Sequence, residues 1–160
     1  SGRAVTDFTR KDNQPLTMIN IGLTGLAALI IILVIDVHMN GPVFGGLLTI
    51  VGFSAFGKHP RNVLPPMIGV LIMSLIFNME LSVPLVLAIL FASSLAPISG
   101  EFGFIAGIAS GMLHLPIAFS LSQLHGGVLL YSNGFAAAFT AVIIVTVIHT
   151  FRKGENHGTA

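Results

Sequence analysis

Residues 16–37, LTMINIGLTGLAALIIILVIDV, form an almost uninterrupted apolar run. A helix needs about 20 such residues to cross a hydrocarbon core about 30 Å thick, so this run predicts a transmembrane helix. Five further apolar runs follow, several of them shorter than a usual span, at residues 43–56, 63–77, 81–98, 102–121 and 135–151. We therefore expect an all-α polytopic transmembrane helical bundle of about six short and partly broken helices. Five spans plus a re-entrant helix is the alternative.

The composition favours lipid as the surrounding solvent. The chain has 160 residues, of which 54% are hydrophobic and only 8% charged, and its mean hydropathy is +0.93. A soluble domain carries roughly a quarter charged residues, so this chain lacks the charge to cover a water-facing surface. Cysteine is absent, which excludes disulfides and thiolate metal sites. A net charge of +1 without a long basic run argues against nucleic acid as a partner.

The chain divides into a polar lead-in at residues 1–15, a single transmembrane helical domain at residues 16–151 and a polar tail at residues 152–160. It begins Ser-Gly-Arg rather than with methionine, so we expect a processed, tagged or excised piece. If all six helices cross, the basic side chains share one face of the membrane. Because basic loops face the cytoplasm, we expect both termini to be cytoplasmic and the protein to lie in the inner membrane. These basic residues are Arg3, Arg10, Lys11, Lys58, Arg61, Arg152 and Lys153.

Residues 56–69, FGKHPRNVLPPMIG, place a cluster of basic side chains between two apolar runs. Pro60, Pro65 and Pro66 disfavour a helix that runs through this stretch. We interpret it as a tight cytoplasmic turn in which Lys58 and Arg61 contact lipid phosphates.

Three junctions begin with Asn or Ser followed by glycine, then carry phenylalanine and small residues. They are NGPVFGG at residues 40–46, SGEFGFIAG at 99–107 and NGFAAAF at 133–139. Asn and Ser are good N-caps, and the unpaired amides of a helix start attract anions or dipoles. Transporters build substrate sites from helix ends of this kind. A capped helix start at the membrane interface is the alternative for each junction.

Gly103, Gly107 and Gly111 recur every four residues and fall along one stripe of a helix. Such a stripe lets a second backbone approach closely, so it predicts helix packing. His114 continues near the stripe and is expected to face protein or a cavity rather than lipid. It is either a hydrogen-bonded structural histidine or a pathway group. In the second case it would be proton-sensitive, as would His59, because an unperturbed histidine titrates near pH ~6.5.

Residues 122–134, SQLHGGVLLYSNG, are the most polar stretch after the first span. With six crossings they form an external loop, in which flexible glycines beside hydrogen-bonding side chains suit a selectivity or gating element. An ordinary loop is the alternative. Asn20 and Thr24 lie one turn apart on the first span and predict hydrogen bonds between helices.

Familiar catalytic motifs do not occur: the sequence has no H-E-x-x-H, G-x-S-x-G, Walker phosphate loop or dinucleotide fingerprint. Asp36 and His38 do not share a helix face and make a poor metal pair. We therefore predict that the chain is not an enzyme and has no cofactor or metal site. The residues predicted to line a solute pathway are Asn40, His59, Asn62, Ser99, Glu101, His114, His125 and Asn133.

The stretches VGFSAFGKHPRNVLPPMIGV and YSNGFAAAF resemble an uncharacterised bacterial family of multi-pass membrane proteins, known as domain of unknown function 1576. The GKHPRN signature is the distinctive part. Members are about twice as long as this chain, so the resemblance covers one half of the family's length. It implies an integral membrane protein and supplies no substrate or catalytic residue. In organisation alone, the chain is similar to transporters and channels of two similar halves, such as urea-channel-like folds.

These features predict a transporter or channel for a small solute or ion, embedded in the lipid bilayer and built from broken helices. Six short spans are few for a complete pathway, so we expect a homo-oligomer or pairing with a second similar half. A membrane scaffold or subunit of a larger complex is the first alternative, and an intramembrane enzyme is the second.

Overall fold

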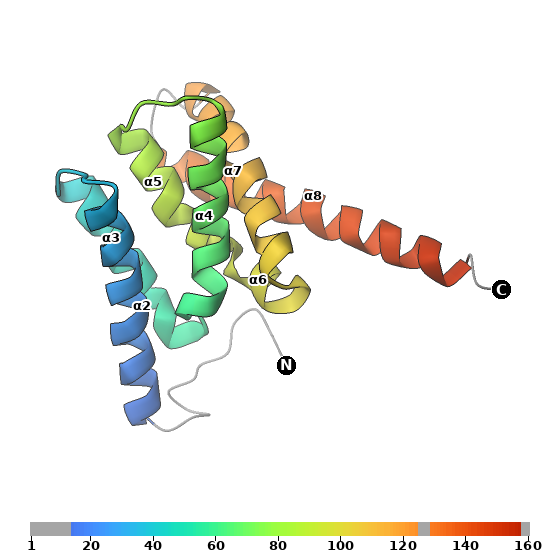
Figure 1. Cartoon of the computed structure of the whole chain (residues 1–160), viewed down its shortest axis with the longest axis horizontal. Coiled ribbons are helices and arrows are strands. Elements are labelled where there is room, and N and C mark those ends of the chain that lie inside the picture. The colour runs from blue at the N-terminus through green and yellow to red at the C-terminus, as the bar shows by residue number, and fades with distance from the viewer. Residues whose placement is uncertain (1–13, 125–128, 158–160) are drawn as a thin grey trace.

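The structure, a computed structural model, describes residues 14–124 and 129–157, and every regular element in these residues is helical (Figure 1). The first three elements are α2 (Gln14–Val34), α3 (Gly41–Phe53) with its short 3-10 continuation η1 (Ser54–Phe56), and α4 (Pro60–Ile76). A broken helix follows, made of α5 (Val83–Phe91), the 3-10 turn η2 (Ala92–Leu95) and α6 (Ala96–Phe102). The last two are α7 (Phe104–Leu124) and α8 (Leu129–His157).

Four of the described helices are long and apolar enough to cross a membrane: Gln14–Val34, Val83–Phe102, Phe104–Leu124 and Ser132–Phe151. Two shorter apolar helices, Gly41–Phe56 and Pro60–Ile76, lie between the first and second of these. The prediction of an all-α bundle of six short and partly broken helices is confirmed within the described residues. By helix length and hydropathy, the chain is a multi-pass membrane protein.

The two polar ends differ from the expected division of the chain. The lead-in predicted at residues 1–15 lies almost wholly outside the described residues, and α2 already begins at Gln14. The backbone of residues 152–157, expected in a polar tail, continues α8 as far as His157.

Proline marks where several helices begin. Pro42, Pro60 and Pro84 occupy the first or second position of α3, α4 and α5, where a missing amide hydrogen costs no intrahelical bond. The expectation that Pro65 and Pro66 interrupt a helix is wrong, because both lie inside α4. Proline has no amide hydrogen, so the carbonyls four positions before Pro65 and Pro66 lose their helical partners. Both carbonyls belong to the first turn of α4, so the rest of the helix keeps its hydrogen bonds.

Left-handed backbone closes the turns after α2, η1 and α4. Asp36, Gly57 and Asn78 have φ angles of 54°, 109° and 49°. In each turn the following residue donates its amide to a carbonyl five positions earlier, which is a common way to end a helix. Glycine, asparagine and aspartate tolerate this conformation best, so each helix can turn back directly against its neighbour.

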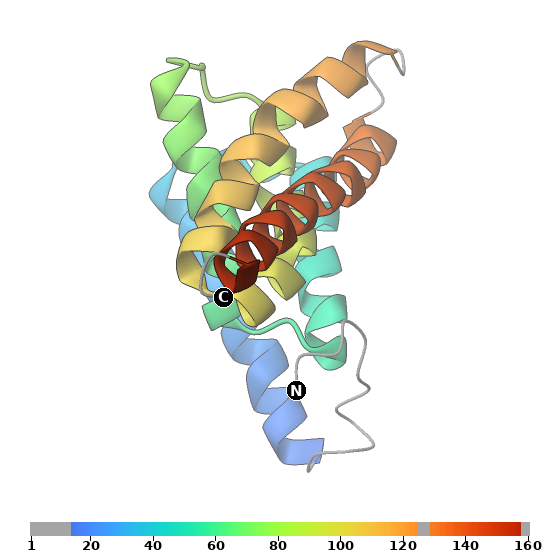
Figure 2. The ribbon, with the colours of Figure 1, turned by 90° about the vertical axis from the view of Figure 1, so that its right-hand side faces the viewer.

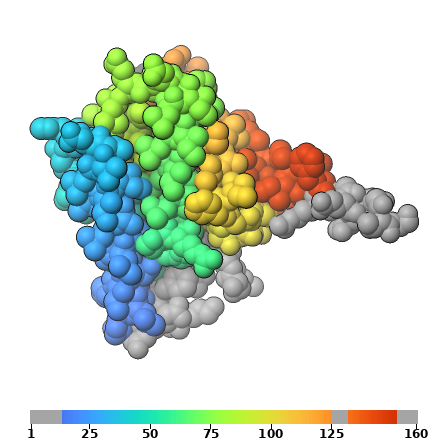
Figure 3. Space-filling view, in the orientation of Figure 1, coloured from blue at the N-terminus to red at the C-terminus, as the bar shows by residue number. Residues whose placement is uncertain are grey.

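The helices form a bundle around α4. In Figure 1, α2 and α3 lie side by side at one edge, α4 stands beside them, and the broken helix passes behind α4 from α5 to α6. α7 lies along α4, as the space-filling view also shows (Figure 3). Figure 1 and Figure 2 show that α8 is oblique to the other helices and that its C-terminal part extends away from them; α8 packs on α7 and on the broken helix.

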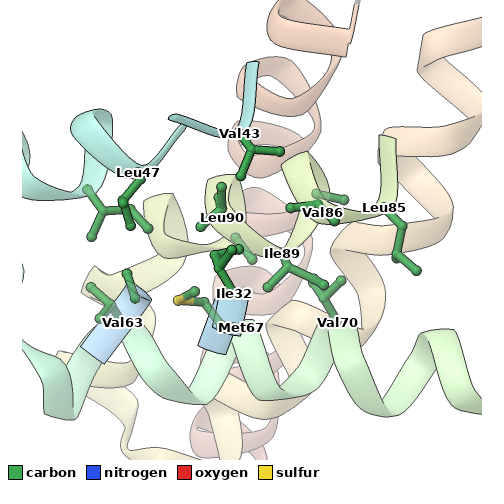
Figure 4. Packing of buried hydrophobic residues seen from close by; sticks show 14 of the residues in the cluster. Ile32, Val43, Leu47, Val63, Met67, Val70, Leu85, Val86, Ile89 and Leu90 are labelled. Atoms are coloured by element: carbon green, nitrogen blue, oxygen red, sulfur yellow. The ribbon is translucent and has the colours of Figure 1, made fainter. Parts of the chain in front are cut away.

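The main apolar core lies chiefly among α2, α3, α4 and α5, and Ala96 of α6 and Leu115 of α7 also belong to it. Ile32, Met67, Ile89 and Leu90 are at most 1% exposed and meet there (Figure 4). A smaller apolar cluster, made of Leu95, Ile98 and Ala137 with partly buried neighbours, packs α8 against η2 and α6.

The outside of the bundle is strongly apolar. Leucine, isoleucine, valine and phenylalanine side chains are exposed along its helices, including Leu26, Leu48, Phe135 and Val142 at 50% or more. A water-soluble protein does not expose apolar surface on this scale, whereas lipid tails solvate such side chains. The surface therefore agrees with a membrane environment.

Candidate functional site

His114 lies within α7 and is completely buried. Its Nε2 atom is 3.2 Å from Oδ1 of Asn133 in α8, a side chain that is also completely buried. Because an amide oxygen only accepts hydrogen bonds, Nε2 carries a hydrogen and donates it. The other ring nitrogen, Nδ1, has no hydrogen-bond partner among the described residues, and in the neutral ring it is an acceptor. The pair joins α7 to α8 through a polar contact inside the bundle.

The buried face of α8 carries further polar side chains. Ser132, Asn133, Ala136, Ala137 and Thr140 are at most 5% exposed and recur with the helical period. Within the described part of the chain, Oγ1 of Thr140 has no hydrogen-bond partner. This face therefore presents hydrogen-bonding groups to the interior at two levels about two turns apart, with Ser132 and Asn133 at one level and Thr140 at the other.

Ser99 brings α6 close to α7 and α4. A Cβ added at Gly107 of α7 would overlap Oγ of Ser99 and lie 2.7 Å from Cβ of Pro65 in α4. Ser99 is 8% exposed, and its hydroxyl has no partner in the described residues. Ser110 donates its hydroxyl to the carbonyl of Gly107 at 2.7 Å. Three helices thus meet around one small, hydroxyl-bearing contact.

Glycine allows backbone contact between α4 and α7. A Cβ at Gly111 would overlap the carbonyl oxygen of Pro66, and one at Gly69 would overlap the carbonyl oxygen of Ile108. Gly107 and Gly111 therefore lie in a close helix–helix contact, as their four-residue spacing predicts.

Gly103 departs from that prediction. It is exposed, and an added Cβ would meet nothing within 4 Å. Its φ of 92° and ψ of 179° belong to a region that is essentially confined to glycine. Gly103 therefore separates α6 from α7 and contributes no packing contact.

The three predicted helix starts have different outcomes. Asn40 caps α3, and its Oδ1 accepts a hydrogen bond from the Val43 amide at 3.0 Å. The other two assignments are wrong, because Ser99 lies inside α6 and Asn133 lies inside α8. The external loop expected at 122–134 is correspondingly shorter, since 122–124 belong to α7 and 129–134 to α8. Apolar residues before Asn133 continue the helical period, so the helix begins earlier.

The seven predicted pathway residues that the structure describes do not line one site. His59 precedes α4, where its amide donates to Oδ1 of Asn62 at 2.8 Å; Asn62 in turn donates Nδ2 to the carbonyl of Gly57 at 3.0 Å. These groups, like Asn40, hold a helix start. Glu101 is exposed near the end of α6, and His125 lies outside the described residues. The candidates buried between α4, α6, α7 and α8 are Ser99, His114 and Asn133.

The surroundings of His59 lower the pKa of its ring. Burial and the nearby charge of Arg61 both lower the pKa of His59 below its ordinary value. The neutral form of His59 is therefore favoured, and Arg61 beside it is exposed.

The side chain of Lys58 has a partner that the sequence does not predict. Its Nζ atom points into the protein, 2.9 Å from Oγ of Ser93 in η2 and 5.0 Å from the centre of the Phe53 ring. The ammonium of Lys58 therefore contacts a second part of the bundle, in addition to the lipid phosphates that the sequence predicts for it. Burial lowers the pKa of Lys58 from 10.5 to about 8. Lys58 and Ser93 are 35 positions apart, so no local spacing signals their contact.

Asn20 fixes the turn that carries Lys58. Its Nδ2 donates to the carbonyls of Ser54 at 3.0 Å and Lys58 at 2.8 Å, which confirms the predicted link between helices. Thr24 instead donates to the carbonyl of Asn20 within α2, so it joins no second helix.

Among the residues that the structure describes, no three histidine, aspartate or glutamate side chains gather closely enough to hold a metal ion. The polar interior is therefore built from hydroxyl, amide and imidazole groups, together with the Lys58 ammonium.

Comparison with known protein families shows to which family the chain is related. The profile of the family described as "Protein of unknown function (DUF1576)" matches residues 1–150. The chain belongs to this family. No curated protein and no solved structure matches the chain. Membership agrees with the resemblance carried by GKHPRN, whose Lys58, His59 and Asn62 make the buried and capping contacts described above.

Proposed function

We propose that this DUF1576 chain transports or conducts a small solute or ion, along a route between α6, α7 and α8 that passes the His114–Asn133 pair. The supporting observation is the set of buried polar atoms without partners among the described residues. Three of them, Ser99 Oγ, His114 Nδ1 and Thr140 Oγ1, belong to α6, α7 and α8. The fourth, Thr17 Oγ1, lies in the first turn of α2.

A polar group buried in a membrane protein is costly unless it forms hydrogen bonds. An ionisable side chain such as His114 is rare within a span and is by default a candidate for a functional site. Hydroxyls that both donate and accept, beside an imidazole acceptor, can replace part of the hydration shell of a small polar solute or a cation.

The helices around this route have the breaks that a transporter uses. The spanning segment Val83–Phe102 is interrupted by η2, and Gly103 separates it from α7. Irregular backbone at membrane depth is tolerated where protein or a water-filled route shields it. The chain acts as a homo-oligomer or with a second similar half. It lies in the inner membrane with both termini cytoplasmic, the orientation that the basic residues favour.

Flux measurements on reconstituted protein test the proposal. The chain, extracted in mild detergent with any stable partner, is placed in liposomes, and influx of neutral solutes and of cations is followed by stopped-flow light scattering and ion-selective dyes. Asn133→Ala should lower flux about tenfold, since it removes a buried hydrogen bond that contributes about 1–2 kcal/mol along the route. Thr150→Ala is the control, because Thr150 is an exposed hydroxyl on the same helix that bonds only its own backbone.

The same preparation separates transport from the scaffold alternative. A stable complex with no intrinsic flux would overturn the transport proposal, and equal flux from wild type, Asn133→Ala and Thr150→Ala would overturn the route past the His114–Asn133 pair. Loss confined to Asn133→Ala, with unchanged assembly on native gels, would support it.

A further inference from the structure

Lys58 stands apart from the route above because different elements form its surroundings. We propose that Lys58 and Ser93 bind an anionic oxygen group, a phosphate or carboxylate, at the junction of α2, η1, α4 and η2. This site does not depend on transport.

The first support is the number of hydrogen-bond donors. A lysine ammonium has three N–H groups, and Nζ of Lys58 makes one hydrogen bond among the described residues, to Ser93 Oγ. The Phe53 ring, 5.0 Å away, adds a weak attraction to the cation. Two donors remain for a ligand. The hydroxyl of Ser93, which accepts from Lys58, can donate its own hydrogen to the same anion.

The second support is that the described residues place no negative charge beside Lys58. The described residues of α2, α3, η1, α4, α5 and η2 contain no aspartate or glutamate. On the elements packed around Lys58, the other charged residues are Arg61, which is also positive, and Glu101 at the exposed end of α6. No ion pair joins Lys58 to a described carboxylate. Because a partly buried cation without a counter-charge is costly, an anion that reaches Lys58 is bound strongly.

The third support is the rigidity of the site. Asn20 holds the backbone of Lys58 through its carbonyl, and Ser93, which is 1% exposed, is fixed in η2. Lys58 itself is half-buried, so its side chain is not wholly enclosed by the bundle. Preorganised donors of this kind lose little freedom on binding. Burial lowers the pKa of Lys58 to about 8, and a bound anion would oppose this effect of burial.

The test uses the full chain in a neutral detergent with two probes. Inorganic phosphate is titrated while thermal unfolding is followed, and retention of phosphatidylglycerol against phosphatidylcholine is measured by native mass spectrometry. Lys58→Gln should weaken binding about tenfold or more, because it removes a charge-assisted hydrogen bond. Arg61→Gln is the matched control. Arg61 lies three positions after Lys58 and is exposed, so this substitution also removes one positive charge but leaves the proposed site intact.

The two probes distinguish the source of the anion. Stabilisation by phosphate identifies a soluble anion, and selective retention of phosphatidylglycerol alone identifies a lipid headgroup; both support the site. Binding of neither probe by wild type, or equal losses in Lys58→Gln and Arg61→Gln, would overturn it. If Lys58→Gln fails to fold, Ser93→Ala serves instead, since alanine fits the same helical position. It should weaken binding several-fold, and unchanged binding would overturn the proposal.

Discussion

At the scale of single residues, Lys58 makes stability depend on pH. Its pKa is lowered to about 8 in the folded chain, against 10.5 for an ordinary lysine. Between these values the unfolded chain binds the proton more than the folded chain does, so the free energy of unfolding rises as the pH increases from about 8 to about 10.5. Below pH 8 the buried charge destabilises the fold.

Lys58→Met should therefore be more stable than wild type at pH 7, and this difference should shrink towards pH 10. Reversible unfolding in neutral detergent, without phosphate or anionic lipid, measures it. Wild type that gains no stability relative to Lys58→Met over this range would show that the ammonium is not buried as described.

Sequence reasoning succeeded for residues whose neighbours lie on the same helix and failed for long-range partners. His114 was expected to face protein because it continues the stripe of Gly107 and Gly111, and it is buried. For its partner Asn133 the sequence predicts a helix cap, since a polar residue before glycine looks the same at a helix start and inside a buried helix. The bond to His114, 19 positions away, distinguishes the two.

At the scale of helices, the contact between α4 and α7 rests on the absence of side chains. A Cβ at Gly111 would overlap the Pro66 carbonyl oxygen, so Gly111→Ala must push the two helices apart. We expect a loss of about 1–3 kcal/mol, the usual cost of overpacking. Gly45→Ala is the matched control, because Gly45 lies exposed inside α3 with nothing within 4 Å of an added Cβ.

Gly45→Ala should be neutral or stabilise the chain by up to about 1 kcal/mol, since alanine favours the helix. Unfolding of both variants in detergent, followed by circular dichroism, measures the difference. Equal effects would contradict the close approach of α4 and α7.

Helix positions were predictable because six apolar runs are separated by proline and glycine, and Pro42, Pro60 and Pro84 stand where helices begin. Helix breaks inside an apolar run were harder to predict from the sequence. Gly103 has the same spacing as the packing glycines, and its role as a helix break depends on a φ of 92° that spacing does not report.

At the scale of the whole molecule, buried polar groups occur on both sides of α4. The helices α2 and α4 bury Thr24, Asn62 and Ser74 around the main apolar core, and α6, α7 and α8 bury hydroxyl, amide and imidazole groups beside a smaller apolar cluster. This arrangement could not be read from the sequence, since it depends on which helices pack together. The apolar exterior could be predicted from the sequence, because only 8% of the residues are charged.

The account depends most on the claim that lipid covers the exposed apolar side chains. The chain has no cysteine, so single cysteines can be placed without background at Leu26, Leu48 and Val142, and at the polar positions His38 and Glu101. Sealed proteoliposomes are treated with a membrane-impermeant maleimide, then solubilised and treated again. We predict that the three apolar positions react only after denaturation, although each is 51% or more exposed in the fold. With six crossings, His38 and Glu101 react from opposite sides. Labelling of Leu26, Leu48 and Val142 as fast as His38 in sealed vesicles would contradict the membrane assignment.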